Sequence, residues 1–462
     1  MEEHVSLNRQ NYIQNILLIY FYKRKDGKKD NKGGLFVNKE DTLAFLTDEK
    51  TKHIFNVLYP GKVDENIKRY QGIVQKFGQV FGERDMFLFS SPGRTEISGN
   101  HTDHNYGKVL AGSINLDCIG VAAKNNTGII HIVSETFSQD FIISLDKLEQ
   151  GENHAGTVEL VKGLVKGFQE FGFQIGGFDL YTSSTVISAA GVSSSAAFEM
   201  LICTILNEFY NEGKLNIVQY AHIGQFAENQ YWDKASGLLD QMACAAGGLV
   251  MLDFKNPKEP VVEKLDFDFA AKKHKLIIVN TGKGHADLSE EYSSVPTEMK
   301  KVAEYFGKTV CAEITEEKVI ENLADIRKAC GDRAVLRALH FFEENKRVEQ
   351  EVLALREGRF EDFLLGITES GNSSWKWLQN CYTSQSCEQG ITIALALTEL
   401  FLKEKKCGAC RVHGGGFAGV IMAMLPEELE GEYTIYMEQA IGAGNVYSMS
   451  IRPYGAVCLT AL

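Results

Sequence analysis

Hydrophobic residues recur along the chain at two spacings. From position 67 to 81 they return every three or four residues, as at Tyr70, Ile73 and Phe77, and this spacing predicts a helix with one buried face. Short apolar runs bounded by Gly, Pro, Asn or Asp predict strands instead. We expect helices at 39–58, 67–81, 157–171, 193–210, 216–232, 294–306, 334–356, 360–379 and 390–403, and strands at 86–90, within 109–145, and at 178–182, 247–253, 275–280, 418–424 and 447–452. Helices and strands mix without strict alternation, which favours an α+β fold.

The length of the chain predicts more than one core. A chain of 462 residues exceeds what a single hydrophobic core usually organises, so we expect two lobes. Charged residues and two prolines gather between 255 and 275, and we place the boundary there, with residues 61–270 in an N-terminal lobe and 271–462 in a C-terminal lobe. Residues 1–60 form an extension, which we expect to be a solvent-facing packing element without chemistry.

Net charge and cysteine content limit the classes of binding partner and the cell compartment that we expect. The formal net charge is −13, which disfavours nucleic acid and anionic lipid as ligands, although backbone N–H groups can still bind a phosphate locally. The apolar run Ile16–Tyr22 is too short to span a membrane, and basic residues follow it instead of preceding it, unlike a secretory signal. Ten scattered cysteines are typical of reduced thiols in a cytoplasmic protein, and we interpret Cys407 and Cys410 as thiols entering a strand, since no second pair completes a zinc site.

A run of small residues at 189–197, AAGVSSSAA, lies between a predicted strand and a predicted helix. Small residues let the backbone approach a ligand, and the N-terminus of the helix offers unpaired N–H groups to an anion. The serine hydroxyls can cap the helix or ligate Mg²⁺. The segment is not the phosphate-binding loop G-x-x-x-x-G-K-[ST], because that pattern is absent. Taken alone, the run also fits an ordinary helix cap.

Three carboxylates follow within positions 225–241, namely Glu228, Asp233 and Asp240. Phosphoryl transfer uses one carboxylate for Mg²⁺ and often a second one to orient or deprotonate the nucleophile. On spacing alone, most such side chains are simply solvated.

Polar side chains are dense from position 93 to 105, directly after a predicted strand. Their density suits a polyhydroxylated ligand, and a polar surface loop is the alternative. A metal site made of His101, Asp103 and His104 would require a strained turn, because the three residues are so close in sequence. A later segment, HGGGFAG at 413–419, fits G-x-G-x-x-G, but only 43 residues follow it, too few for a dinucleotide-binding fold. We interpret it as a glycine loop that supports a site from the second lobe.

Taken together and in this order, the segments resemble the galactokinases of the GHMP kinase superfamily. GRTEISGNHTDHNYGKVL at 93–110 is similar to the sugar signature of that family, and AAGVSSSAA is similar to its phosphate loop. GLLDQ at 237–241, GGGFAG at 414–419 and HADLSEEY at 285–292 resemble three further stretches. The resemblance extends from about Tyr70 to the C-terminus.

The resemblance implies a two-lobed fold, with an N-terminal lobe like the ribosomal S5 domain 2 and a ferredoxin-like C-terminal lobe. It implies transfer of the γ-phosphoryl group of MgATP to the C1 hydroxyl of a sugar, in a monomer or weak homo-oligomer. The residues matched to family positions are Asp240 and Arg94 as catalytic groups, Asn100, His101, Asp103 and Tyr292 as sugar contacts, Gly191, Ser193, Ser194 and Ser195 as phosphate contacts, and Ser194 and Glu228 as Mg²⁺ ligands.

Several positions depart from the family pattern. Asn100 stands where the family has a glutamate near the C6 hydroxyl of the sugar, while Glu96 and His104 replace an asparagine and a tyrosine. Four further departures lie in the loops. Ala189 and Ala190 replace two glycines of the phosphate loop, Ile187 replaces a proline, and Ala418 replaces a glycine of the segment at 414–419. The hypotheses that stay open are a galactose 1-kinase, a kinase for another hexose or an amino sugar, a catalytically silent sensor of sugar and ATP, and a kinase for a non-sugar alcohol such as mevalonate.

Overall fold

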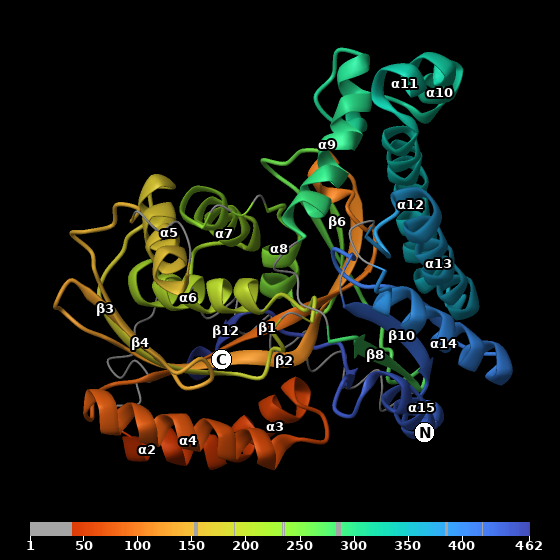
Figure 1. The fold of residues 1–462 in the computed structure, drawn as a ribbon. Helices are drawn as coiled ribbons and strands as arrows, with labels where there is room; N and C mark the ends of the chain where they lie inside the picture. The colour runs from red at the N-terminus through yellow and green to blue at the C-terminus, as the bar shows by residue number, and fades with distance from the viewer. Residues whose placement is uncertain are drawn as a thin grey trace.

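The computed structural model describes residues 39–151, 156–188, 190–232, 234, 236–282, 288–383, 387–417 and 419–462. Two β-sheets, each with helices packed against it, organise this part of the chain (Figure 1). No helix among these residues is both long and apolar enough to cross a membrane.

The first sheet has eight strands in the order β12-β1-β2-β5-β3-β4, and β6 and β7 extend it from β2. Its pairs are antiparallel except β3 with β5. Its strands are β1 Phe87–Ser98, β2 Lys108–Lys124, β3 Ile129–Ser134, β4 Gln139–Ser144, β5 Phe178–Ser184, β6 Leu249–Asp253, β7 Val261–Leu265 and β12 Val457–Cys458. Since β12 pairs with β1, the end of the chain returns to this sheet across the predicted boundary at 270.

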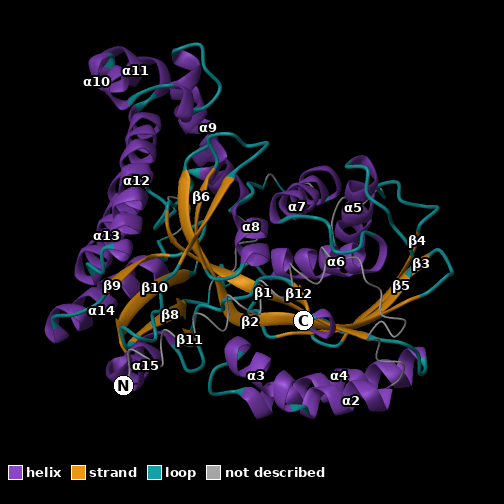
Figure 2. Cartoon of the chain, turned by 180° about the vertical axis from the view of Figure 1, so that it is seen from behind, coloured by secondary structure: helices purple, strands orange, loops and turns teal. Residues whose placement is uncertain are grey.

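Helices cover both faces of the first sheet (Figure 2). Helices α2 Lys39–Thr47, α3 Glu49–Leu58 and α4 Val63–Phe81 lie on one face, and α5 Thr157–Glu170, α6 Ser194–Tyr210, α7 Ile217–Tyr231 and α8 Leu239–Ala246 lie on the other. Phe55, Tyr70 and Phe77 are fully buried under the first layer, so α2 to α4 form part of the core.

The second sheet has four antiparallel strands in the order β11-β8-β10-β9. The strands are β8 His274–Asn280, β9 Ala409–Val412, β10 Val420–Pro426 and β11 Val446–Met449, and the helices packed with them are α14 Gly390–Lys405 and α15 Glu430–Ile441. Along the chain this is the β-α-β-β-α-β order that the ferredoxin-like prediction requires.

Helices fill the long connection between β8 and β9. They are α9 Ser289–Tyr305, α10 Glu316–Glu321, α11 Leu323–Cys330, α12 Asp332–Arg356 and α13 Phe360–Ser373, followed by a π-helical turn at Ser374–Leu378. Figure 1 shows α12 and α13 running side by side along the molecule, with α9 to α11 at one end. Short 3₁₀ turns occur at Asp103–Asn105, Cys311–Glu313, Glu427–Leu429 and Leu459–Ala461.

Most predicted elements are present, and two expectations were wrong. The strand predicted to end before Ser91 continues to Ser98, because the backbone passes Pro92 and Gly93 as a bulge and not as a turn. The helix expected at 39–58 is two helices broken at Asp48, whose side chain caps the second. The segment 255–275, expected to divide the lobes, contains strand β7 of the first sheet, and β8 of the second sheet begins at His274.

Candidate active site

An arginine and an aspartate from distant parts of the chain form a buried ion pair. Arg94 lies in β1 and Asp240 in the first turn of α8, and Asp240 Oδ1 accepts from Arg94 Nε at 2.9 Å and lies 2.8 Å from NH2. The Arg94 side chain is 7% exposed, whereas that of Asp240 is 29% exposed. The pair therefore presents its carboxylate to solvent while the guanidinium stays inside.

The bulge in β1 determines where Arg94 points. Past Pro92 the strand leaves its register with β2, and the Arg94 N–H donates to the Val192 carbonyl of the serine-rich loop at 3.1 Å. A β-carbon on Gly93 would lie 2.6 Å from that same carbonyl, so the close approach requires glycine. The Arg94 guanidinium also donates to the Gly191 carbonyl. The strand and the loop are thereby joined at the site.

Asp240 is held in its ionised form. Burial alone would raise the pKa of this carboxyl, but the positive charges of Arg94 and Lys234 outweigh burial and lower the pKa to about 2. Asp240 is consequently a carboxylate at neutral pH. Helix α8 begins at Leu239, so the Asp240 carboxylate lies at its N-terminal end.

The serine-rich loop forms the N-terminus of α6. Gly191 and Ser193 both have left-handed backbones, with φ of 62° and 58°, and α6 begins at Ser194. The Ser193 hydroxyl is buried and interacts with the Asp240 carboxylate, whose pKa it helps to lower. The free N–H groups of the first turn and this hydroxyl make a cradle suited to an anion. Ala190 has an ordinary negative φ, so its methyl group is tolerated.

Several residues that the sequence analysis names lie outside the described residues. They are Ala189 and Ala418, which replace family glycines, the carboxylate Asp233, His285 and the apolar run Ile16–Tyr22.

A buried carboxylate adjoins this cradle. Glu228 of α7 is 1% exposed, and its Oε1 accepts from the Ser195 hydroxyl at 3.3 Å. Lys234 Nζ lies 2.5 Å from the same oxygen, and Gln241 donates to Oε2 at 3.1 Å. A cation therefore already lies beside the Glu228 carboxylate, at the base of the loop.

The residues fit a magnesium ion of the kind shared with a nucleotide. Ser194 and Glu228 supply the oxygen ligands that Mg²⁺ prefers, and Ser195 brings the first turn of α6 against Glu228. Within the described chain, no group of three His, Cys, Asp or Glu side chains is arranged to hold a metal.

The sugar-signature residues adjoin the same place. A β-carbon on Gly237 would lie 1.9 Å from Asp103 Oδ2, so the Asp103 carboxylate rests directly on the segment that leads to Asp240. His101 Nε2 donates to the Gly415 carbonyl at 2.8 Å, and burial lowers the pKa of His101 to about 3. The neutral ring has a proton on Nε2, so its Nδ1 is an acceptor available to a hydroxyl group.

Asn100 occupies a different environment from the one expected of a sugar contact. Its side chain is fully buried, and Nδ2 donates to Glu96 Oε1 and to the Gly414 carbonyl, both at 2.7 Å. Asn380 donates to its Oδ1 at 2.7 Å. Because protein groups bind both the nitrogen and the oxygen of the amide, Asn100 has a structural role in this structure: it joins the sugar signature to Gly414 and Asn380.

The glycine segment at 414–419, called the third glycine segment below, contacts residues of the sugar signature. Carbonyls of Gly414, Gly415 and Gly416 accept from Asn100, His101 and Tyr292, the last at 2.7 Å. A β-carbon on Gly415 would lie 2.2 Å from the Tyr292 ring, so only glycine allows this packing. The structure thus brings together every predicted site residue.

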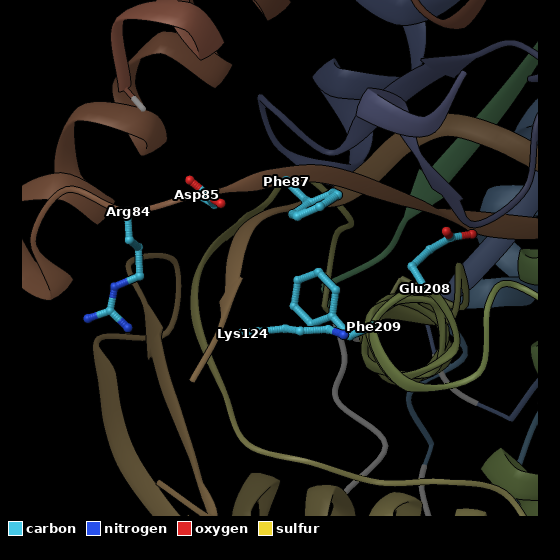
Figure 3. A pocket seen from close by; sticks show the side chains of 6 residues that line it. All are labelled: Arg84, Asp85, Phe87, Lys124, Glu208 and Phe209. Carbon is cyan, nitrogen blue, oxygen red and sulfur yellow. The ribbon is translucent and has the colours of Figure 1, made fainter. Parts of the chain in front are cut away.

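A pocket elsewhere in the molecule takes no part in this site. Figure 3 shows it between Arg84, Lys124, Phe87 and Phe209, at the C-terminal end of α6. With a rise of about 1.5 Å per residue, this end lies roughly 20 Å from the N-terminus of α6. Arg84 is already paired with Asp179.

Sequence reasoning missed Lys234, Asn380 and His413. Lys234 and Asn380 belong to no motif, so no signal marked them. His413 directly precedes the third glycine segment, and that position was the available signal.

Comparisons with known proteins agree with this arrangement. Residues 75–124 match the galactokinase galactose-binding signature, and residues 159–248 match the N-terminal domain of GHMP kinases. Galactokinase from Clostridium tetani is 27% identical over 76% of this chain and 87% of its own length. Galactokinase from Enterococcus faecalis is 29% identical over 82% of this chain and 97% of its own length.

Solved structures share the fold. Lactococcus lactis galactokinase complexed with galactose superposes with a TM-score of 0.72 at 24% identity, covering 84% of this chain and 99% of that one. Methanococcus jannaschii mevalonate kinase gives 0.55 at 17% identity, covering 79% and 98%. The chain has the GHMP kinase fold, and its residues 159–248 match the N-terminal domain of the GHMP kinase superfamily. Within it, the galactokinases are relatives along most of the chain.

Proposed function

We propose that this protein is an ATP-dependent galactose 1-kinase. The observation that carries the proposal is the Arg94–Asp240 pair, which lies beside an anion cradle at the N-terminus of α6 and beside the sugar-signature residues. We also propose that the protein works in the cytoplasm, which its ten free cysteines support. The resemblance to galactokinases is the basis for proposing a monomer or weak homo-oligomer.

In this proposal the C1 hydroxyl oxygen of the sugar attacks the γ-phosphorus while the bond from that phosphorus to the β,γ-bridging oxygen breaks, which releases ADP. Asp240 orients the hydroxyl and receives its proton, and Arg94 stabilises the negative charge that develops. With a pKa near 2, Asp240 is a weak base, so the proton is transferred late, as the new bond to phosphorus forms.

Ser193, Ser194, Ser195 and Gly191 would contact the phosphate chain at the N-terminus of α6. Ser194 and Glu228 would hold Mg²⁺, which neutralises phosphate charge when bound. His101 and Asp103 would accept hydrogen bonds from sugar hydroxyls. Tyr292 would help by fixing the glycine segment beneath them.

Glu228→Gln is expected to raise the Mg²⁺ concentration needed for half-maximal turnover by about tenfold or more, because the amide supplies one neutral ligand in place of a carboxylate. ADP release titrated with Mg²⁺ at saturating ATP and galactose measures this. Glu159→Gln, on the neighbouring helix α5, is the control. An unchanged Mg²⁺ requirement would remove Glu228 from the metal site.

Asn100→Glu is expected to destabilise the protein increasingly between pH 5 and pH 8. The new carboxylate would lie beside Glu96, whose pKa burial already raises to about 7 despite Arg411 and Arg94. Two carboxylates that share one site repel each other once both ionise, so the loss of stability grows with pH. Melting temperatures across this pH range measure the effect.

The exchange Glu96→Asn with Asn100→Glu keeps one carboxylate and one amide in contact. It is expected to recover most of the lost stability, whereas Asn256→Glu in an exposed loop should change little. If Asn100→Glu alone melts like the wild type at pH 8, the two side chains do not interact as described.

The function is tested by ADP release with MgATP against D-galactose, 2-deoxy-D-galactose, D-galactosamine, N-acetylgalactosamine, D-glucose, D-fucose and L-arabinose. Galactose clearly ahead of the others is the expected result. Preference for another hexose or an amino sugar would keep the mechanism and change the substrate. No turnover with any sugar, together with calorimetric sugar binding, would favour the silent sensor instead.

A further inference from the structure

A histidine outside the predicted site connects three of its segments. His413 follows β9, is 1% exposed, and lies directly before the third glycine segment. Its Nε2 accepts from the Glu96 N–H at 3.2 Å and lies 3.0 Å from the Thr95 hydroxyl, both in the sugar-signature strand. Its Nδ1 faces the phosphate loop, because a β-carbon on Gly191 would lie 3.1 Å from it.

The contacts determine the protonation of the ring. A backbone N–H can only donate, so Nε2 must be the acceptor and carries no proton. Burial, followed by the charges of Arg94 and Arg411, lowers the pKa of His413 well below its usual value, so the ring is neutral. The proton of a neutral ring with an accepting Nε2 is on Nδ1.

This Nδ1–H group is a buried donor without an acceptor among the described residues. Leaving such a donor unsatisfied is costly, and native proteins seldom do so without a functional reason. The donor faces Gly191, and Gly191 keeps part of its own surface exposed, so the donor adjoins an accessible turn of the loop. The buried Ser193 hydroxyl belongs to the same loop.

We propose that His413 positions the phosphate chain of the bound nucleotide, with its Nδ1–H donating to a phosphate oxygen at the Gly191 turn while its Nε2 anchors the ring to the sugar-signature strand. This inference rests on the proposed function, because it requires that a nucleotide binds at the N-terminus of α6. It adds a side-chain donor to a cradle otherwise made of backbone N–H groups and serine hydroxyls.

Two substitutions distinguish the role of Nδ1 from the role of Nε2. In His413→Gln the amide reaches the position of Nε2 and keeps an acceptor for the Glu96 N–H, but leaves no donor at Nδ1. In His413→Asn the amide reaches only the position of Nδ1, so a donor remains there and the anchor to Glu96 is lost. His413→Gln should therefore lower the nucleotide affinity, whereas His413→Asn should lower the stability.

The test is calorimetric titration of the full-length protein with the magnesium complex of a non-hydrolysable ATP analogue, with MgADP and with adenosine. We expect His413→Gln to bind the two phosphate-bearing ligands about 10- to 100-fold more weakly, the range for a hydrogen bond to a charged group, with adenosine affinity and melting temperature nearly unchanged. We expect His413→Asn to melt at a lower temperature and to retain most of its nucleotide affinity.

Nuclear magnetic resonance on protein with ¹⁵N-labelled histidine gives a second readout. The wild type should show a His413 ring protonated on Nδ1 whose proton resonance shifts when the analogue is added, and this resonance should be absent from His413→Gln. Equal nucleotide affinity of wild type and His413→Gln, or a resonance that the analogue leaves in place, would overturn the inference. A wild type that binds no nucleotide would overturn the proposed function as well, so the two failures are distinguishable.

Discussion

Asp240→Asn is expected to lower kcat by about 10²- to 10⁴-fold while leaving nucleotide affinity nearly intact. The asparagine keeps the size of the side chain but can neither receive the proton of the sugar hydroxyl nor compensate the charge of Arg94. The phosphate cradle lies on α6, whereas Asp240 belongs to α8, so the nucleotide contacts stay in place. ADP release gives kcat, and calorimetric titration with the ATP analogue gives the affinity.

The chain offers a matched control. Asp332 also lies in the first turn of a helix, α12, and binds an arginine, Arg327, at 2.7 Å, but both side chains are more than half exposed. Asp332→Asn should leave both kcat and the melting temperature nearly unchanged, as for other surface ion pairs. If Asp240→Asn retains most of the wild-type kcat, the carboxylate is not the catalytic group, and the Arg94 pair is structural.

Periodicity predicted the elements well where burial decides the pattern. The helix at 63–81 has one buried face, and that face was readable as a repeat of apolar residues. Prediction failed where contacts distant in sequence decide the structure. Pro92 and Gly93 usually break a strand, but here the Val192 carbonyl satisfies the backbone beyond them, so the strand continues.

The candidate site was predictable as motifs but not as a set of contacts. Asp103, His101 and Asp240 stand in recognisable segments, whereas the partner that each one touches lies more than a hundred residues away. Asn100 shows the difference most clearly. Its position in the motif indicated a contact with the ligand. In the structure its amide instead hydrogen-bonds to Asn380 and Gly414, which belong to the second lobe. Periodicity carries no information about such long-range pairs.

Asp117→Asn is expected to destabilise the fold by about 3–5 kcal/mol at neutral pH. Asp117 in β2 is fully buried and pairs with Arg452 at 2.9 Å and with Arg69 at 2.5 Å. Tyr59, at the end of α3, also donates to it. The asparagine would leave two guanidinium groups without a counter-charge, and the cost of burying them would no longer be offset. Urea unfolding followed by circular dichroism measures the loss.

The pH dependence of this loss tests its cause. Burial would raise the pKa of Asp117, but Arg69 and Arg452 outweigh burial and lower the pKa below its usual value. A carboxyl whose pKa is lower in the folded state contributes its stability above about pH 4 and loses it as the pH falls through the folded pKa. The difference between wild type and Asp117→Asn should therefore shrink from pH 6 to pH 3.

Asp140→Asn provides the comparison, because Asp140 pairs with His131 on the surface and is 67% exposed. It should cost less than about 1 kcal/mol. Should Asp117→Asn fail to fold, Arg69→Met reports on the same network, since it removes one charge and leaves the Asp117–Arg452 pair. A loss as small as that of Asp140→Asn would show that the network does not hold the N-terminal helices and the end of the chain to the first sheet. A large loss that persists unchanged at pH 3 would assign the effect to packing and not to charge.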